Sequence, residues 1–271
     1  MKKITNGFLL LALFGITLYS CKKAETESND DGVSVATKVK ISALGFGTSN
    51  VQKTEDGYLV EGDINLTDEL LNSSPSQSLL RIANNEQYRT TNLVTALPRV
   101  IKVKVTSLGT AFIQGTDLAI ARYNALGLKM TFQRITSGTA NINIKGFNQG
   151  PSGGFITLGS SGFPTGGNPY STIKMNTNAQ AYGSNPDVNY VGSVIQHEMG
   201  HCIGMRHTDY YDRSYSCGGA VANEGASTIG AILIPGTPST ANAESWMLAC
   251  SNGGDRTFNS NDIVGLNYLY K

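Results

Sequence analysis

Histidine, cysteine and tryptophan are all scarce in this sequence. Its 271 residues include three histidines, four cysteines and one tryptophan. All three histidines, His197, His201 and His207, fall within one stretch of eleven residues. A residue type that is rare in the whole chain and gathered in one place predicts a single functional site there.

Neither sign of charge dominates. The chain has 21 Lys and Arg residues against 20 Asp and Glu residues, which gives a net charge of +1. This balance offers no electrostatic case for binding nucleic acid or an acidic membrane surface. The sequence also has no internal repeat, and its glycine-rich stretches lack a phosphate-binding pattern between a strand and a helix, so nucleotide chemistry has no support.

Long apolar runs are missing except at the N-terminus. Two lysines precede an apolar stretch from Phe8 to Leu18, which is too short to span a bilayer comfortably. Residues 1–21 are therefore predicted to be an export signal. Residues 18–21, Leu-Tyr-Ser-Cys, resemble the lipobox of bacterial lipoproteins, which implies that Cys21 is lipidated. Plain secretion is the alternative.

With Cys21 lipidated, three cysteines remain. They are Cys202, Cys217 and Cys250. An oxidising cell envelope permits one disulfide and leaves one free thiol, and the sequence does not fix the pairing. We favour Cys217 with Cys250 because both lie in turn-rich segments, whereas Cys202 lies in the histidine segment and is expected to be a small buried side chain.

The composition changes along the chain and predicts four segments. After the signal, residues 22–45 are charged and poor in large apolar groups, so they are expected to form a disordered tether. Residues 46–92 are modestly apolar and are expected to form a small propeptide, with Arg81 and Arg89 as candidate cleavage positions. Residues 93–271 are then one domain.

Alternating apolar residues in this last segment predict five strands. Helical spacing predicts a helix at 117–126, a second one around the histidines and a final one at 259–270, capped by Asn259 or Ser260. The expected strands are 99–105, 128–133, 141–144, 154–158 and 172–176. The sequence therefore predicts an α/β (α+β) fold: an α/β lobe, then an irregular lobe that ends in a helix.

The histidine spacing predicts a zinc site. His197 and His201 are four residues apart, so on a helix both imidazoles face the same point. Gly204 can turn the chain sharply and return His207 as a third ligand. Three histidines with no suitably spaced fourth protein ligand describe a catalytic zinc site with an open position. The alternative is a helix with two ordinary core histidines, and a structural calcium ion has no support.

Glu198 follows the first histidine directly. Its carboxylate is expected beside the metal but not on it, where it can take a proton from a zinc-bound water and return it to the leaving amine. These roles predict hydrolysis of a peptide bond.

The pattern from His197 to His207 resembles that of metzincin zinc endopeptidases. The chain is most similar to the bacterial dual-action HEIGH metallopeptidases, over roughly residues 58–271, with Met199 where that family usually has isoleucine. The resemblance implies a twisted, mixed five-stranded sheet and two major helices. It also implies that Met247 is the methionine of a Met-turn, which packs beneath the zinc ligands without binding zinc.

One further feature is similar to astacins, and a second departs from the astacin pattern. Residues 60–64, Val-Glu-Gly-Asp-Ile, resemble the astacin propeptide motif, which implies that Asp63 occupies the open zinc position and keeps the enzyme latent. A surface turn is the alternative for this stretch. Ala249 stands where astacin-like and serralysin-like members have a tyrosine, so the group that stabilises the oxyanion is unassigned, with Tyr210 and Tyr211 as candidates.

We therefore expect a zinc endopeptidase that is made as a latent lipoprotein and acts on proteins or peptides. We expect it to be a monomer in the cell envelope, touching the membrane only through its lipid anchor, or secreted. The alternative is a cell-surface binding lipoprotein that keeps the fold but has little or no activity. Substrate preference is not predicted, because it depends on the shapes of loops.

Overall fold

The computed structural model describes residues 32–72, 87–225, 230–238 and 240–271. The predicted signal, its lipobox cysteine Cys21 and the candidate cleavage position Arg81 lie outside these ranges. No helix among the described residues is both long and apolar enough to cross a membrane.

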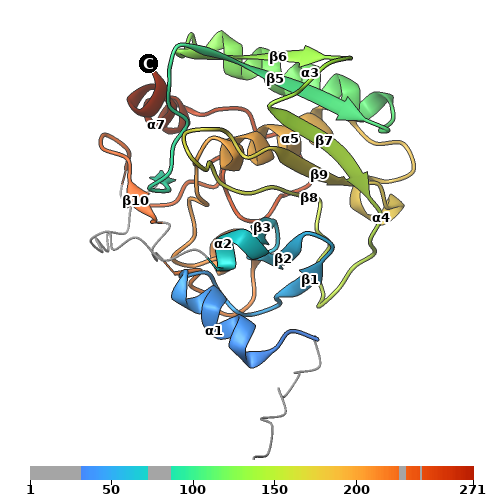
Figure 1. Cartoon of the computed structure of the whole chain (residues 1–271), viewed down its shortest axis with the longest axis vertical. Helices are drawn as coiled ribbons and strands as arrows, with labels where there is room; N and C mark the ends of the chain where they lie inside the picture. The colour runs from blue at the N-terminus through green and yellow to red at the C-terminus, as the bar shows by residue number, and fades with distance from the viewer. Residues whose placement is uncertain (1–31, 73–86, 226–229, 239) are drawn as a thin grey trace, which may run out of the picture.

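The N-terminal lobe is a small unit with a hydrophobic cluster of its own. It lies below the main sheet in Figure 1, drawn in blue and cyan. Its core includes Ile41, Val60, Ile64 and Leu66, and Phe163 from the larger lobe completes it. The elements are α1 (Val35–Ala43), β1 (Gln52–Thr54), β2 (Gly57–Val60), β3 (Ile64–Thr67) and α2 (Asp68–Leu71), with the three strands forming an antiparallel sheet.

The expected disordered tether at residues 22–45 is wrong for its C-terminal part. Ser34 caps α1 by accepting a hydrogen bond from the backbone N–H of Thr37. Ile41 and Leu44 are then buried in the core of the N-terminal lobe. The charged residues of this segment dominate its composition, so its short apolar face is not evident from the sequence. The helix is stable because the rest of the lobe packs against that face.

A mixed five-stranded sheet forms the larger lobe, so the predicted fold class is confirmed. The strand order is β6-β5-β7-β9-β8, with β8 antiparallel at one edge and the other strands parallel. The strands are β5 (Arg99–Thr106), β6 (Met130–Ile135), β7 (Ile142–Phe147), β8 (Gly159–Ser160) and β9 (Thr172–Asn176).

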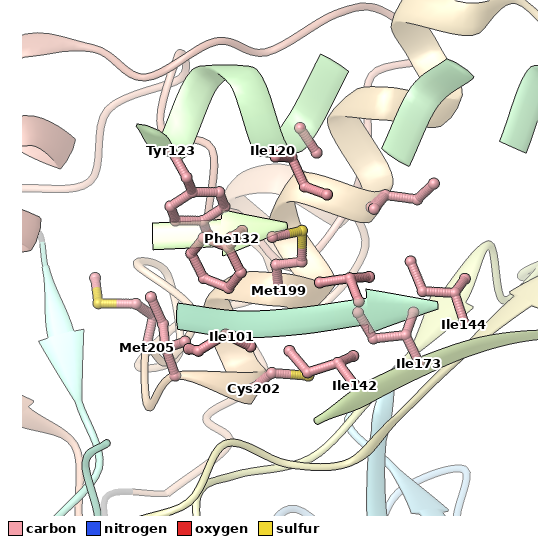
Figure 2. Packing of buried hydrophobic residues seen from close by; sticks show 14 of the residues in the cluster. Ile101, Ile120, Tyr123, Phe132, Ile142, Ile144, Ile173, Met199, Cys202 and Met205 are labelled. Atoms are coloured by element: carbon pink, nitrogen blue, oxygen red, sulfur yellow. The ribbon is translucent and has the colours of Figure 1, made fainter. Parts of the chain in front are cut away.

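Two long helices, α3 (Thr110–Ala125) and α5 (Val188–Cys202), pack against the sheet. Ile101 and Val103 of β5 are buried against them, while the residues between point the other way. Figure 2 shows Tyr123 of α3 and Met199 of α5 on the same side of β5. The Tyr123 hydroxyl donates to the carbonyl of Gln196 at 2.9 Å, which ties α3 to the helix that carries the histidines.

Two predicted elements had wrong boundaries. The helix expected at 117–126 begins at Thr110, because Phe112 and Thr116 continue its buried face through a stretch with low helix propensity. The strand expected at 154–158 does not form. Gly153 and Gly154 have positive φ and make a tight turn there, and the edge strand is β8, two residues long.

Residues 87–92 pack against the larger lobe, although the predicted propeptide extends to residue 92; where the propeptide ends stays a prediction. Arg89 lies in β4 (Tyr88–Arg89), which pairs with β10 (Ile232–Leu233), and the backbone N–H of Thr90 donates to the carbonyl of Gly204. Gln87 is fully buried and donates to Asp262. Cleavage at Arg89 would cut through this packing.

The short helices α4 (Ala179–Tyr182) and α6 (Ser214–Cys217) precede and follow the histidine segment, and α7 (Ser260–Tyr270) ends the chain. Asn259 caps α7, as one of the two predicted caps, and Asp262 completes a capping box. The Asp262 carboxylate also accepts hydrogen bonds from Ser245 and from the backbone N–H of Trp246. It therefore joins α7 to the segment just before Met247.

Asp262→Asn should lower the free energy of unfolding by about 1–3 kcal/mol, because either orientation of the new amide sets its NH₂ group against an N–H donor. Burial raises the pKa of Asp262 to about 7. The folded chain then binds more protons than the unfolded chain between about pH 4 and 7. The contribution of Asp262 to stability therefore falls as pH rises through this window.

Urea unfolding of the wild type and of Asp262→Asn at pH 4.5 and 7.5 measures both effects. The difference between the two proteins in their response to pH isolates residue 262. Glu244→Gln, at an exposed position on the same segment, is the control. Equal pH dependence in wild type and Asp262→Asn would show that Asp262 does not titrate in this window.

Candidate metal centre

The local structure of α5 brings the three histidines together as the spacing predicts. Asp187 caps the helix by accepting from the backbone N–H of Tyr190 at 2.9 Å. The helix ends at Cys202, and Gly204 adopts a φ of +105°. A β-carbon at this position would lie 2.8 Å from the carbonyl oxygen of Asn92, so only glycine fits this turn. The turn returns His207 toward the helix.

The imidazole Nε2 atoms meet at one point. His201 Nε2 lies 3.0 Å from His197 Nε2 and 3.2 Å from His207 Nε2. Ligand nitrogens bound at about 2.1 Å to a tetrahedral zinc ion lie about 3.4 Å apart. His197 and His207 therefore lie slightly closer to His201 than a shared ion would hold them, so a small outward shift of the rings would admit the ion.

Each histidine is oriented through its other ring nitrogen. His197 Nδ1 lies 2.9 Å from the carbonyl oxygen of Trp246, and His201 Nδ1 lies 2.8 Å from that of Met205. His207 Nδ1 lies 3.0 Å from both carboxylate oxygens of Glu224. A proton held at Nδ1 leaves a lone pair at Nε2, which is the arrangement of metal-binding histidines. The donor set therefore fits a zinc ion.

Charge and burial act on the three rings differently. Burial lowers the pKa of His201, and the other two histidines lower it further, so this ring is held neutral. Burial alone would lower the pKa of His207 too, but Asp63 and Glu224 raise it well above its usual value. The anionic surroundings of His207 favour positive charge at this point, whether from a proton or from a metal ion.

Asp63 reaches the same point from the N-terminal lobe. Its Oδ2 lies 3.1 Å from His207 Nε2 and 3.3 Å from His197 Nε2. Burial would raise its pKa, but His207 and His197 hold the pKa well below its usual range. Its Oδ1 is buried and has no hydrogen-bond partner among the described residues. Asp63 and the three histidines form a group whose ligand atoms all lie within 4.8 Å of one another.

Backbone pairing holds Asp63 in place. The backbone N–H of Ser161 donates to the Asp63 carbonyl at 2.9 Å, and that of Asn65 donates to the Ser161 carbonyl at 2.6 Å. The preceding residues do form a turn, with Glu61 and Gly62 at positive φ. Asp63 nevertheless points inward, so the exposed surface turn considered for this stretch does not describe it.

Glu198 lies beside the histidines and lines a cleft of about 800 Å³. The hydroxyl of Ser161 donates to Glu198 Oε2 at 2.7 Å. Burial raises the pKa of Glu198 well above its usual value, and the charge of Asp63 adds to this rise. A β-carbon at Gly159 would lie 2.8 Å from Glu198 Oε1, so the edge strand packs tightly against the carboxylate. The carboxylate is thus fixed in direction and prepared to hold a proton.

Met247 lies under the histidine helix. Gly200 lies between His197 and His201 on α5, and a β-carbon on it would lie 2.7 Å from Met247 Sδ. The same atom would lie 2.3 Å from the ring of Trp246, which also lines the cleft. Both side chains are buried. The helix can rest on the methionine because position 200 has no side chain.

Asp209 and the cysteines support the turn that follows Met247. Asp209 accepts from the backbone N–H of Ala249 at 2.9 Å, so it joins the third histidine's segment to this turn. The structure forms a disulfide between Cys217 and Cys250 and leaves Cys202 as a buried free thiol. Of the pairings open from sequence, the structure therefore has the favoured one.

Neither tyrosine considered for the oxyanion lines the cleft. Tyr210 is buried against Tyr88, and the Tyr211 hydroxyl accepts from the backbone N–H of Ala241. The cleft does contain the cationic side chain of Arg213. Neither Tyr210 nor Tyr211 is therefore placed to stabilise the oxyanion.

Sequence reasoning missed a buried network around His207. Glu224, which orients this histidine, lies 3.2 Å from Arg213 and 3.8 Å from Arg206. Arg206 forms a second ion pair with Glu61 of the N-terminal lobe at 3.1 Å. Glu224 stands in a glycine-containing loop with no periodic pattern, so no local signal pointed to it.

Comparison with known proteins places this geometry in context. The model of the family described as dual-action HEIGH metallo-peptidase matches residues 58–270. Two solved structures of myroilysin match at 15% identity and a TM-score of 0.41, covering 66% of this chain and 86% and 82% of theirs. Likeness at this level carries no inference on function. No curated protein matches the chain.

Proposed function

This chain belongs to the dual-action HEIGH metallopeptidase family. We propose that it is a zinc endopeptidase of the metzincin type. The observation that supports zinc most directly is the convergence of His197, His201 and His207 at their Nε2 atoms, each ring oriented through Nδ1. The packing of Met247 beneath this group supports the metzincin subclass.

The side chains divide the work of peptide hydrolysis. When bound by the three histidines, zinc supplies Lewis acidity, which lowers the pKa of a coordinated water to about 7 and polarises the substrate carbonyl. Glu198 accepts the proton of the attacking water at its carboxylate and passes it to the leaving nitrogen. Ser161 holds that carboxylate in position by donating to Oε2.

We also propose that the described chain is latent. Asp63 lies against His207 and His197, at the position where water and substrate have to bind. A carboxylate oxygen is a good zinc ligand, so Asp63 would complete the coordination and exclude water. Withdrawal of the N-terminal lobe would reopen the position.

The export signal and the lipobox cysteine Cys21 remain the basis for proposing a cell-envelope lipoprotein that acts on proteins or peptides as a monomer. A silent binding lipoprotein is the weaker alternative. Glu198 is retained in the cleft and oriented by Ser161, an arrangement that binding alone would not need.

Removal of the metal tests this proposal. We expect the purified, activated protein to contain one zinc ion per chain, measured by atomic emission, and to cleave casein. A strong chelator should abolish cleavage, and stoichiometric zinc should restore it. Casein cleavage that persists in metal-free protein would contradict the proposal. Unfolding curves with and without metal serve as the control for loss of structure.

A further inference from the structure

Glu61 carries a second contact between the N-terminal lobe and the cleft. It lies two residues before Asp63, and its carboxylate accepts from Arg206 Nη2 at 3.1 Å and from the backbone N–H of Gly47 at 3.1 Å. Its backbone carbonyl accepts from Arg213. Its carboxylate, His207 and Glu224 have ligand atoms within 4.8 Å of one another. An acidic side chain is thus held directly beside the third histidine.

Arg206, the ion-pair partner of that carboxylate, is almost completely buried, with 1% of its side chain exposed. Its guanidinium lies over the rings of Phe46, Phe163 and Tyr210, at 5.3–5.9 Å from their centroids. Its Nη1 is buried without a hydrogen-bond partner among the described residues. Buried charge is costly unless it is paired, so this position favours an anion.

Removing the N-terminal lobe would take away Glu61, Gly47 and Phe46 together. Two cations, Arg206 and Arg213, would remain with one anion, Glu224, which already orients His207. The net charge of this group would be +1. Arg213 lines the cleft, and the space that Glu61 occupies also borders it.

We propose that, in the activated protein, Arg206 and Arg213 form a subsite for the carboxylate of a substrate glutamate or aspartate within two residues of the cleaved bond. The inference rests on the proposed peptidase function and names its substrate class. Glu61 shows that this space accepts an acidic side chain. Asp63, two residues further along the same segment, lies against the zinc-ligand histidine His207. Phe163 and Tyr210 would keep the pair away from water and so strengthen it.

Matched peptides test this subsite. The full-length protein is incubated with zinc, and its active form is identified by N-terminal sequencing. It is then given peptide pairs that differ only by Glu against Gln at each of the two positions on either side of the cleaved bond. We expect kcat/KM to favour glutamate by about tenfold or more at one position.

Arg206→Gln should reduce this ratio toward one because Arg206 contacts the Glu61 carboxylate, and Arg213→Gln should reduce it less because Arg213 contacts the backbone carbonyl of Glu61. Arg256→Gln is the control, since Arg256 also lines the cleft but donates to the carbonyl of Cys250 and does not contact Glu61 in the described structure. Equal cleavage of both members of every pair would overturn the subsite while leaving the peptidase intact. Failure of the N-terminally processed form to cleave any peptide with zinc bound would overturn the proposed function and the subsite with it.

Discussion

Glu198→Gln should reduce the cleavage of casein by about 10²–10⁴-fold, the usual contribution of a general base. Glutamine has the same shape as glutamate but cannot accept a proton at neutral pH. The hydroxyl of Ser161 can still donate to its amide oxygen, so the side chain should keep its position. The variant separates proton transfer from packing.

The measurement is the rate of casein cleavage per mole of enzyme, with zinc content determined on the same sample. Glu198 is not among the grouped candidate ligands, so we expect the variant to bind one zinc ion as the wild type does. Glu244→Gln, at an exposed position, provides a control for the loss of a carboxylate elsewhere. Full activity in Glu198→Gln would refute the role of this residue, whatever its effect on stability.

Asp63→Asn should raise the activity of the uncleaved full-length chain by roughly 10–100-fold, because each tenfold change needs only about 1.4 kcal/mol of weaker binding to the closed state. Asparagine preserves the size of the side chain but has no negative charge. It therefore weakens the contact with His207 and His197, which lie 3.1 and 3.3 Å from the carboxylate oxygen.

Initial rates have to be recorded while the chain is intact, which electrophoresis and N-terminal sequencing can verify. Glu55→Gln, an exposed change in the same lobe, should leave the chain latent. If Asp63→Asn is no more active than wild type, the N-terminal lobe does not inhibit through this carboxylate. If the wild-type chain is already fully active, there is no latency to relieve.

The parts of the site that sequence could predict are those set by local geometry. Helical spacing places His197 and His201 together, and the glycine at 204 allows the turn to His207. Alternation along the strands likewise predicts most of the sheet, because one face of each strand is buried. These inferences need only residues that lie a few positions apart in the sequence.

The missed parts depend on contacts between distant segments. Glu224 reaches His207 from seventeen residues away, and Glu61 reaches Arg206 across a separation of 145. No short pattern encodes such pairs. For the same reason α1 was missed: Ile41 is buried by the rest of its lobe and not by its own helix.

The disulfide between Cys217 and Cys250 bears on the stage of export at which the peptidase could become active. The bridge joins residues 33 apart and encloses Glu224, the partner of His207. Cysteines stay reduced in the cytoplasm and pair after export. For a chain exported as proposed, the loop that carries Glu224 would be closed only outside the cytoplasm. The unformed disulfide and the contact of Asp63 with the histidines would then both limit proteolysis in the cytoplasm.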